Sequence, residues 1–484
     1  MKQALHIFKK DVRYLRYEIM LELLVVLAFC FLGTHNMHGP GPVAFILPVT
    51  WWFLIARVIH AEALPSSRQF WLTRPYAWKS LLGAKVLFIL AFINLPLLIA
   101  DAVIVHAAGF SIAEEFAGLL WTQVLLTTVF LLPAAALSAI TSGLAEMLVV
   151  TLLLVIIALA RLLVPSAHWN FYWMESEWVK TYYLVTQIAA AAAIVLLWQY
   201  ACRRTFVTRT IIGVAALAVV IGSALLPWRA AFALETHLSR RDMEPASIRI
   251  ELDANRKWMG RIYSSGQGQI VAELPLQVSG LPNGTILKPN GLTVTLRSSD
   301  GETWIVHRPP PDSFDFESGI TSLQAAMSRA FYEKVKDRPL QFRGTLYFTL
   351  YGNERNTPIP VNGAPVPVNG VGLCSAAARY LLCNSAFRQQ SGWAAFRLLQ
   401  ATRSGTRTTT ENLSRIGSYS PFPADINVDP LIRFFSPQLT AISEASVETW
   451  EPIAHLERNF EMDGVRLDDF AVSPDLLPLR KRTR

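Results

Sequence analysis

The sequence predicts a membrane α-helical bundle of about seven transmembrane helices, followed by an all-β, sandwich-like region outside the membrane. Two observations predict this fold class. Residues 1–228 consist mostly of apolar runs separated by short loops, whereas residues 229–484 have mixed charge and regularly spaced turns. A helix needs about 20 apolar residues to cross a bilayer. The change of composition therefore predicts two domains, 1–228 and 229–484.

The N-terminal domain contains seven apolar runs that are long enough to cross a bilayer. They cover residues 19–34, 43–60, 82–107, 117–137, 144–164, 181–200 and 210–228. Residues 138–145 separate the fourth run from the fifth, which predicts either a tight turn or the break of a re-entrant pair. Pro96 and Pro133 lie inside runs and predict kinks, which membrane helices tolerate.

Basic residues are concentrated on one side of these runs. The N-terminal segment and the loops after the second and sixth runs hold Lys2, Lys9, Lys10, Arg13, Arg16, Arg57, Arg68, Arg74, Lys79, Lys85, Arg203, Arg204 and Arg209. Cytoplasmic loops carry an excess of lysine and arginine, so this pattern predicts a cytoplasmic N-terminus. An odd number of crossings then places the chain after Trp228 outside, in the periplasm if the membrane is a bacterial inner membrane.

The segment before the first run has a helical repeat. Leu5, Phe8, Val12, Leu15 and Ile19 fall on one helix face, and basic side chains lie off that face. This pattern is typical of an interfacial helix that lies flat on the cytoplasmic leaflet. The alternative is a solvated extension of the first span.

Residues 61–85 form a basic and aromatic loop between the second and third runs. The residues predicted to dock a cytoplasmic partner are Arg68, Phe70, Trp71, Arg74, Tyr76, Trp78, Lys79 and Lys85. Aromatic side chains favour headgroup depth, and the cations can pair with acids of a partner. The simpler interpretation is that the same residues only anchor the loop to the membrane.

Five polar residues lie in or near the apolar runs. They are Asn94, Asp101, His106, Glu146 and Gln187. Ionisable groups inside a membrane are functional candidates by default. Most of these positions are close to predicted span ends, so each residue either lines a pathway or reaches the interface.

The C-terminal domain shows strand patterns from residue 246 onward. Alternating or β-branched stretches cover 247–252, 269–281, 292–298, 303–308, 341–352, 370–374, 378–383, 392–400, 446–462 and 464–472. Turn-forming residues at 281–284, 288–291, 298–301 and 351–356 predict where strands end. Ile320, Leu323, Met327, Ala330 and Phe331 form a stripe at helical spacing, which predicts one helix between the strands. The length of the region favours two packed subdomains, 229–362 and 363–484.

Two cysteines lie in this region, nine residues apart. Cys374 and Cys383 fit two strands of a hairpin with their side chains facing each other, and a disulfide there needs an oxidising compartment. Two buried thiols are the alternative. Without a nearby histidine or second cysteine pair, the spacing does not suit a metal.

The sequence has no motif of an enzyme. It contains no P-loop, no H-E-x-x-H and no G-x-S-x-G, so we expect no catalytic set, no cofactor and no metal site. The net charge of +8 could favour nucleic acid. The soluble half, however, lacks the basic face with interleaved aromatic residues of a nucleic-acid reader. We therefore expect no nucleic-acid partner.

Residues 1–205 resemble the permease subunits of the ABC-2 type transporter superfamily. Three features carry the resemblance: the basic amphipathic N-terminal segment, six spans with a cytoplasmic loop after the second, and the run Arg74-Pro75-Tyr76-Ala77-Trp78-Lys79-Ser80-Leu81-Leu82-Gly83-Ala84-Lys85. In that family, this short segment contributes to the contact with a separate ATPase subunit. The seventh span and the large C-terminal region depart from the usual six-span permease.

The resemblance implies a membrane subunit of an ABC-type transporter or envelope-remodelling complex. Its partners would be a separate ABC ATPase that docks on residues 61–85, membrane lipid, and a second copy or a related permease. A different class also fits the residues: a non-transporting membrane-anchored sensor or scaffold whose periplasmic β region binds an envelope partner.

Overall fold

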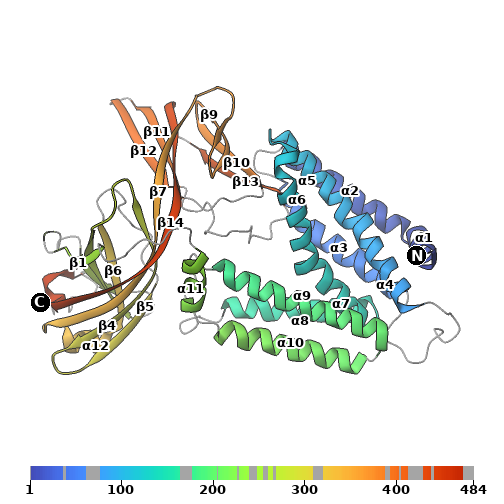
Figure 1. Ribbon diagram of the computed structural model, residues 1–484, viewed down its shortest axis with the longest axis horizontal. Helices are drawn as coiled ribbons and strands as arrows, with labels where there is room; N and C mark the ends of the chain where they lie inside the picture. Colours follow the sequence, from blue (N-terminus) through green and yellow to red (C-terminus); the bar gives the residue numbers. More distant parts are fainter. Residues whose placement is uncertain are drawn as a thin grey trace, which may run out of the picture.

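The computed structural model separates the chain into a helical part and a β part (Figure 1). The described residues are 2–35, 40–61, 77–163, 177–203, 205–225, 228–238, 248–253, 255, 260–264, 269–308, 320–386, 393–402, 405–412, 429–437 and 441–472. All following statements concern these residues.

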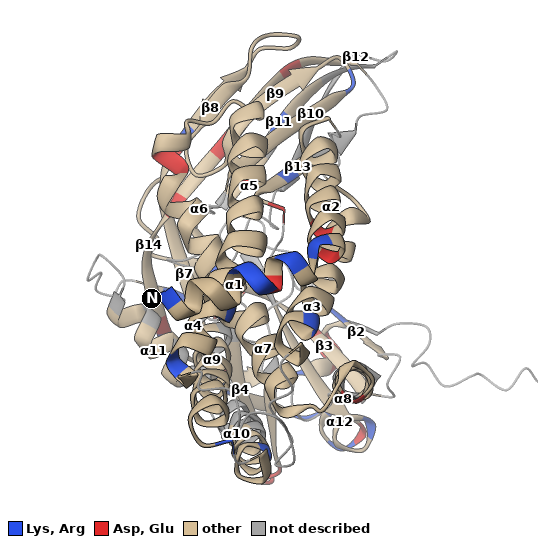
Figure 2. Cartoon of the chain, turned by 90° about the vertical axis from the view of Figure 1, so that its right-hand side faces the viewer, with Lys and Arg blue, Asp and Glu red and all other residues tan. Residues whose placement is uncertain are grey.

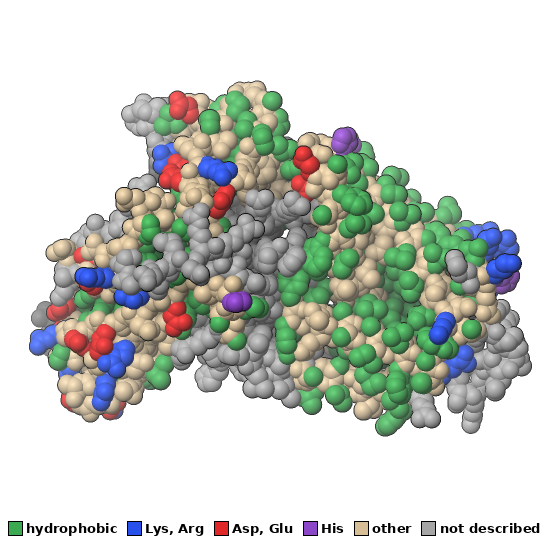
Figure 3. All heavy atoms as spheres, viewed as in Figure 1, with side chains coloured by type: hydrophobic (Ala, Val, Ile, Leu, Met, Phe, Trp, Pro, Cys, Tyr) green, Lys and Arg blue, Asp and Glu red, His purple; other side chains and the backbone are tan. Residues whose placement is uncertain are grey.

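Five helical segments of the described chain are long and apolar enough to cross a membrane. They are Arg16–His35 (α2), Val43–His60 (α3), Trp78–Ala107, Ile112–Ile140, and Tyr182–Cys202 within α9 (Glu177–Cys202). Shorter apolar stretches, Leu144–Ile156 and Thr205–Ala215, lie in α8 (Leu144–Leu163) and α10 (Thr205–Leu225). The chain is therefore a multi-pass membrane protein with five candidate spans in its helical region. Figure 3 shows apolar side chains over most of the visible face of this region.

Two of these spans are interrupted at matching places. The third consists of α4 (Trp78–Ile89), the π-helical turn η2 (Leu90–Asn94) and α5 (Leu95–Ala107). The fourth consists of α6 (Ile112–Leu126), the π-helical turn η3 (Thr127–Leu131) and α7 (Leu132–Ile140). Each π turn precedes a Leu-Pro pair, and proline has no N–H to donate to the carbonyl four residues earlier. The predicted kinks at Pro96 and Pro133 thus take the form of π turns.

The bundle packs around large apolar side chains. α2 packs against both α3 and α5, and α7 packs against α3 and α9. Trp51 of α3, Phe29 of α2 and Phe88 of α4 are completely buried in the bundle. The N-terminal helix α1 (Lys2–Tyr14) packs against α4 at one end of the bundle.

The C-terminal part consists of three mainly antiparallel β-sheets. The first has the order β12 (Gly405–Asn412), β11 (Trp393–Thr402), β14 (Ile442–Val465), β7 (Leu340–Ile359), β4 (Ile286–Ser298) and β5 (Thr303–Arg308). The second has the order β13 (Leu431–Pro437), β10 (Tyr380–Ala386), β9 (Gly372–Ala377) and β8 (Val366–Val368). In the third, β3 (Gln269–Ser279) pairs with β1 (Arg249–Leu252), β2 (Arg261–Ser264) and β6 (Ile320–Ser328), and β15 (Ala471–Val472) runs parallel to β2.

The two longest strands, β7 and β14, pair along most of their length and connect two hydrophobic clusters. One cluster lies among β3, β4, β6 and the short helix α12 (Arg329–Val335), and the other lies among β9, β10 and β11. Leu456 and Phe460, from the end of β14, belong to the first cluster. The clusters therefore do not follow a division of the chain at residue 362.

The helix predicted over residues 320–331 is wrong for most of its length. Residues 320–328 form strand β6, and only residues 329–335 are helical. Leu323, Ala325 and Met327 are all buried, which is the two-residue alternation of a strand that pairs with β3. The Ser328 hydroxyl then accepts a hydrogen bond from the Phe331 N–H (3.2 Å) and starts the helix.

Two predicted turns are bulges inside strands. Residues 288–291 lie within β4, where the register with β7 shifts between Pro289 and Gly291. Residues 351–356 lie entirely within β7, whose pairing with β14 shifts twice opposite them. Proline, glycine and asparagine tolerate such irregular positions as well as turns, and here the neighbouring strands continue past them.

Candidate functional site

The predicted docking face is at the end of the bundle that carries α1, which we call the inner end. The opposite end, where Gly33 contacts β13, we call the outer end. Figure 2 shows α1 crossing the bundle, with its basic residues coloured blue along the helix. Lys2, Lys9, Lys10, Arg13 and Arg16 are all exposed.

A buried ion pair fastens α1 to α4. The Lys85 Nζ donates to the Asp11 Oδ2 at 2.7 Å, and the two side chains are 3% and 1% exposed. Truncating one partner of a buried pair leaves an uncompensated charge, which costs roughly 3–5 kcal/mol. The pair therefore fixes the position of α1 against the third span.

Aromatic packing continues this contact. The ring of Phe8 lies 5.9 Å from that of Phe92 and 6.4 Å from that of Phe88. The face of α1 that is buried includes Ile7 and Asp11, whereas Leu5, which was predicted to belong to the apolar stripe, is 47% exposed. The buried face is thus rotated from the predicted stripe toward Asp11, because Asp11 has its partner inside the bundle.

The described docking residues lie in two different environments. Lys79 is exposed at the start of α4, with its Nζ 5.6 Å from the centre of the half-buried Trp78 ring. Lys85 is 2% exposed, so its pairing with Asp11 replaces the partner contact expected of it. The remaining predicted docking residues lie outside the described part of the chain: Arg68, Phe70, Trp71, Arg74 and Tyr76.

Further polar contacts hold the inner halves of the first spans. The Arg57 guanidinium donates to the Glu18 carboxylate at 3.2 Å, and the Trp51 Nε1 donates to the buried Glu22 carboxylate at 2.6 Å. Both acids lie at the start of the first apolar run, and the sequence predicted no partner for either of them. Their partners are 39 and 29 residues away, so no local sequence pattern reveals these contacts.

The outer end contacts the β part through β13 and the segment before it. The Arg433 guanidinium donates to the Gly33 carbonyl oxygen at 2.9 Å and forms an ion pair with Asp429. Burial raises the pKa of the Asp429 carboxyl, and the neighbouring Arg433 opposes this shift. Ala386 and Leu431 pack into the hydrophobic core of the bundle beside this contact.

The predicted disulfide is confirmed. Cys374 and Cys383 are bonded and lie directly opposite each other in the β9–β10 pair, with their Cα atoms 4.0 Å apart. Because stable disulfides need an oxidising environment, the bond indicates that the β part is extracytoplasmic.

The five polar residues predicted in the spans lie in four different environments. Asn94 and Asp101 join a buried hydrogen-bonded cluster with Gln123. Glu146 is bonded to Ser142 and Arg209, and His106 is exposed near the outer end.

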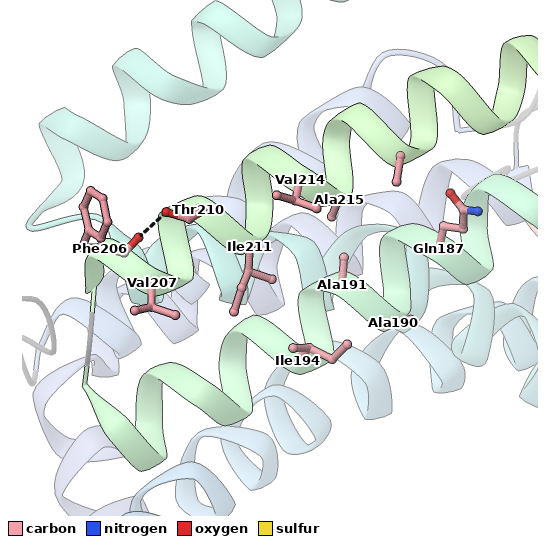
Figure 4. A pocket seen from close by; sticks show the side chains of 11 residues that line it. Gln187, Ala190, Ala191, Ile194, Phe206, Val207, Thr210, Ile211, Val214 and Ala215 are labelled. Carbon is pink, nitrogen blue, oxygen red and sulfur yellow. Dashed lines mark hydrogen bonds between the residues drawn. The ribbon is translucent and has the colours of Figure 1, made fainter.

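Gln187 has a separate environment from the other four. It lies at the rim of a mostly apolar groove of about 570 Å³ between α9 and α10 (Figure 4).

The described residues do not form a metal centre. Nowhere in this part of the chain do three His, Cys, Asp or Glu side chains lie close enough together to hold an ion.

Comparison with known proteins does not assign the chain to a family. No protein-family model matches the sequence, and no curated protein matches it.

Proposed function

We propose that this chain is the membrane subunit of an ABC-type transporter or envelope-remodelling complex, energised by a separate ATPase. The ATPase docks on residues 61–85 at the inner end. The observation that supports this most is the buried Asp11–Lys85 pair. It connects the basic helix α1 to the start of the third span, directly after the basic and aromatic loop.

This connection couples the docking loop to the movement of the bundle helices. Lys85 lies about two helical turns beyond Trp78, and the Phe8 ring contacts α4 and η2. A displacement of the loop therefore moves α1 and the α4–α5 span together. The exposed cations Lys79, Arg13 and Arg16 favour a partner surface with acidic side chains.

The complete architecture under this proposal has seven crossings. The helices α8 and α10 supply the two crossings beyond the five candidate spans. The N-terminus is cytoplasmic in a bacterial inner membrane, and the sandwich-like β part is periplasmic. The working unit is a homodimer, or a heterodimer with a related permease, embedded in lipid. Reporter fusions at residue 1, near Ser66 and after Arg484 test this topology, and a cytoplasmic signal from the last fusion contradicts it.

One observation favours the second candidate, a membrane-anchored sensor or scaffold. The β part is bonded to the outer end of the bundle through Arg433 and Gly33, so a ligand on the β part can act on the helices without any ATPase. Both candidates use the same contact, and only the first requires a partner at the inner end.

Charge reversal of the docking face separates the two candidates. The variant combines Arg68→Glu, Arg74→Glu and Lys79→Glu, and the matched control combines Arg297→Glu, Arg329→Glu and Lys334→Glu on the exposed surface of the β part. Like charges in a docked contact cost several kcal/mol, which lowers affinity by about a hundredfold or more. We expect the first variant, and not the control, to lose a co-purifying ATPase.

Membrane insertion is measured for both variants, because the first also weakens the positive-inside signal. Lys2, Lys9, Lys10, Arg13 and Arg16 remain to orient the chain. If wild-type protein purified in mild detergent carries no ATPase, and the docking variant keeps its function, the scaffold candidate replaces the transporter subunit.

A further inference from the structure

Four polar side chains form a hydrogen-bonded line inside the bundle, apart from the docking face. The Asn94 Nδ2 donates to the Thr127 Oγ1 (3.0 Å) and to the Gln123 Oε1 (3.2 Å). The Gln123 Nε2 donates to the Asp101 Oδ2 (3.3 Å). We call Asn94, Asp101, Gln123 and Thr127 the polar line. Asp101 is fully buried, and Asn94 and Gln123 are 7% and 8% exposed.

The two π turns provide the inner end of this line. Asn94 is the last residue of η2 and Thr127 is the first residue of η3. Each turn interrupts its helix in the middle of a span, just before a Leu-Pro pair. π turns within α-helices are rare and occur frequently at functional sites. Here the two breaks face each other and are joined by the Asn94–Thr127 hydrogen bond.

The two ends of the polar line have different surroundings. Asp429, whose partner is Arg433, interacts electrostatically with Asp101 from the outer end, as does Cys30 of α2. At the inner end, Asn94 and Thr127 border a mostly apolar cavity of about 90 Å³ that reaches Lys85. The surroundings of Asp101 on the outer side are therefore polar. At the inner end, the apolar cavity separates Thr127 from the buried Lys85–Asp11 pair.

The Asp101 carboxyl has no cation bonded to it among the described residues. Its Oδ1 has no hydrogen-bond partner, and the same is true of the Asn94 Oδ1. An ionised carboxylate without a cationic partner in such a site costs several kcal/mol. The nearby Asp429 carboxylate adds repulsion, and the Arg433 guanidinium already pairs with Asp429. Protonation removes both penalties.

We propose that Asp101 is a proton-binding site, and that binding of the proton reverses the hydrogen bonds along the polar line. One proton adds to the carboxylate and gives the neutral acid, with no other reactant. The oxygen and nitrogen of an amide are assigned from its hydrogen-bond network, so both amides can turn over in place. The Asp101 Oδ2–H then donates to the Gln123 Oε1, and the Gln123 Nε2 donates to the Asn94 Oδ1.

The reversal also reaches the π turns. The Asn94 oxygen, which otherwise lacks a partner, now accepts from the Thr127 hydroxyl as well as from Gln123. A change of protonation below the β part is thereby transmitted to the two helix breaks in the middle of the membrane. Binding of a proton at Asp101 thus changes the hydrogen bonds along the bundle as far as the π turns.

Infrared difference spectroscopy on the full chain in lipid nanodiscs tests the proposal directly. At pH 7, wild-type protein should show the C=O stretch of a protonated carboxylic acid, sensitive to D₂O and to ¹³C-aspartate labelling. Asp101→Asn should abolish this band, and Gln123→Leu should move it to higher frequency because the acid loses its hydrogen-bond acceptor. The control Glu114→Gln, at an exposed acid of α6, should leave it unchanged. Absence of the aspartate band from wild type, or its survival in Asp101→Asn, overturns the proposal.

A second measurement identifies the ligand. Wild-type protein should lose thermal stability at alkaline pH, because Asp101 then loses its proton to the solvent and leaves a charged carboxylate in an apolar site. Asp101→Asn should lose less stability. At constant pH, sodium and choline chloride should give equal stabilities. A sodium-dependent gain that Asp101→Asn abolishes makes the ligand a metal cation and overturns the proposal. If Asp101→Asn does not fold, Asp101→Glu decides, because it should replace the aspartate band by one that no longer responds to ¹³C-aspartate.

Discussion

In the bundle, the side chains of the Lys85–Asp11 pair are 3% and 1% exposed, whereas those of the Lys334–Glu302 pair in the β part are 62% and 46% exposed. The bond lengths are similar, 2.7 and 3.0 Å. Exposure determines their importance, because water and salt screen a surface pair, whereas breaking a buried pair leaves a charge that water does not solvate. The comparison teaches that losing one partner of the buried pair in the helical part should cost more than losing one partner of the exposed pair on the β surface.

The largest expected effect comes from the buried pair. Asp11→Asn removes one charge and leaves Lys85 buried, so the free energy of unfolding should fall by about 3–5 kcal/mol. Thermal and denaturant unfolding of the detergent-purified chain measures this, with Lys9→Ala on the exposed face of α1 as control. The double variant Asp11→Leu/Lys85→Met should recover most of the loss. A single variant that costs no more than its control would remove the distinction between buried and exposed pairs.

The disulfide should rank second. Cys374→Ser opens a short loop, so we expect a loss of roughly 2–3 kcal/mol, at the low end for disulfides. Denaturant unfolding of the β part, with and without reductant, measures the effect, and reductant should change wild type but not the variant. Cys202→Ser, at an exposed free cysteine, is the matched control. Complete alkylation of both thiols in native, unreduced membranes would contradict the bond itself.

The contact between the two parts should rank third. Arg433→Met removes the hydrogen bond to the Gly33 carbonyl and the ion pair with Asp429, at a cost of about 2 kcal/mol. Because burial raises the pKa of Asp429 in the folded protein, the folded state binds its proton more tightly than the unfolded state. Stability should therefore fall as pH rises from about 4, and more steeply in Arg433→Met. Asp429→Asn should flatten this fall, and an unchanged pH profile would show that Asp429 is solvated.

The smallest effect should come from the exposed pair. Lys334→Ala should change the free energy of unfolding by about 0.5 kcal/mol or less, and high salt should remove even this difference. Unfolding at low and high ionic strength, beside Asp11→Asn, completes the comparison. A loss as large as that of the buried pair would mean that exposure does not determine the value of a pair in this protein.

The sequence predicted well what depends on local pattern. Apolar runs located the five candidate spans, and the spacing of Cys374 and Cys383 located a bond between adjacent strands. Patterns that depend on a distant neighbour were misread. The apolar residues of 320–328 fit a helical spacing and also a two-residue alternation. Pairing with β3 stabilises the strand instead of the helix. The residues of 351–356 suit a turn, but β14 continues beside them.

The same limit applies to the site. The sequence identified Lys85 as basic and Asp11 as an acid in a helix, but the two are 74 residues apart and neither position reveals the other. Asn94 and Asp101 were visible as polar residues in an apolar run. Gln123, which joins them, lies on a different span, so only the packing of α5 against α6 reveals the polar line.

The long pairing of β7 with β14 sets the order in which the β part can fold. Gln341 and Glu461, bonded across these strands, are 120 residues apart in the sequence. Synthesis therefore completes β7 long before its partner exists, and an unpaired strand edge is a template for association with other chains. The helix α11 (Trp228–Leu238) precedes both strands, and its Phe232 ring lies 5.2 Å from that of Tyr347 in β7. We expect this helix, which is synthesised before β7, to be the first surface against which β7 can pack.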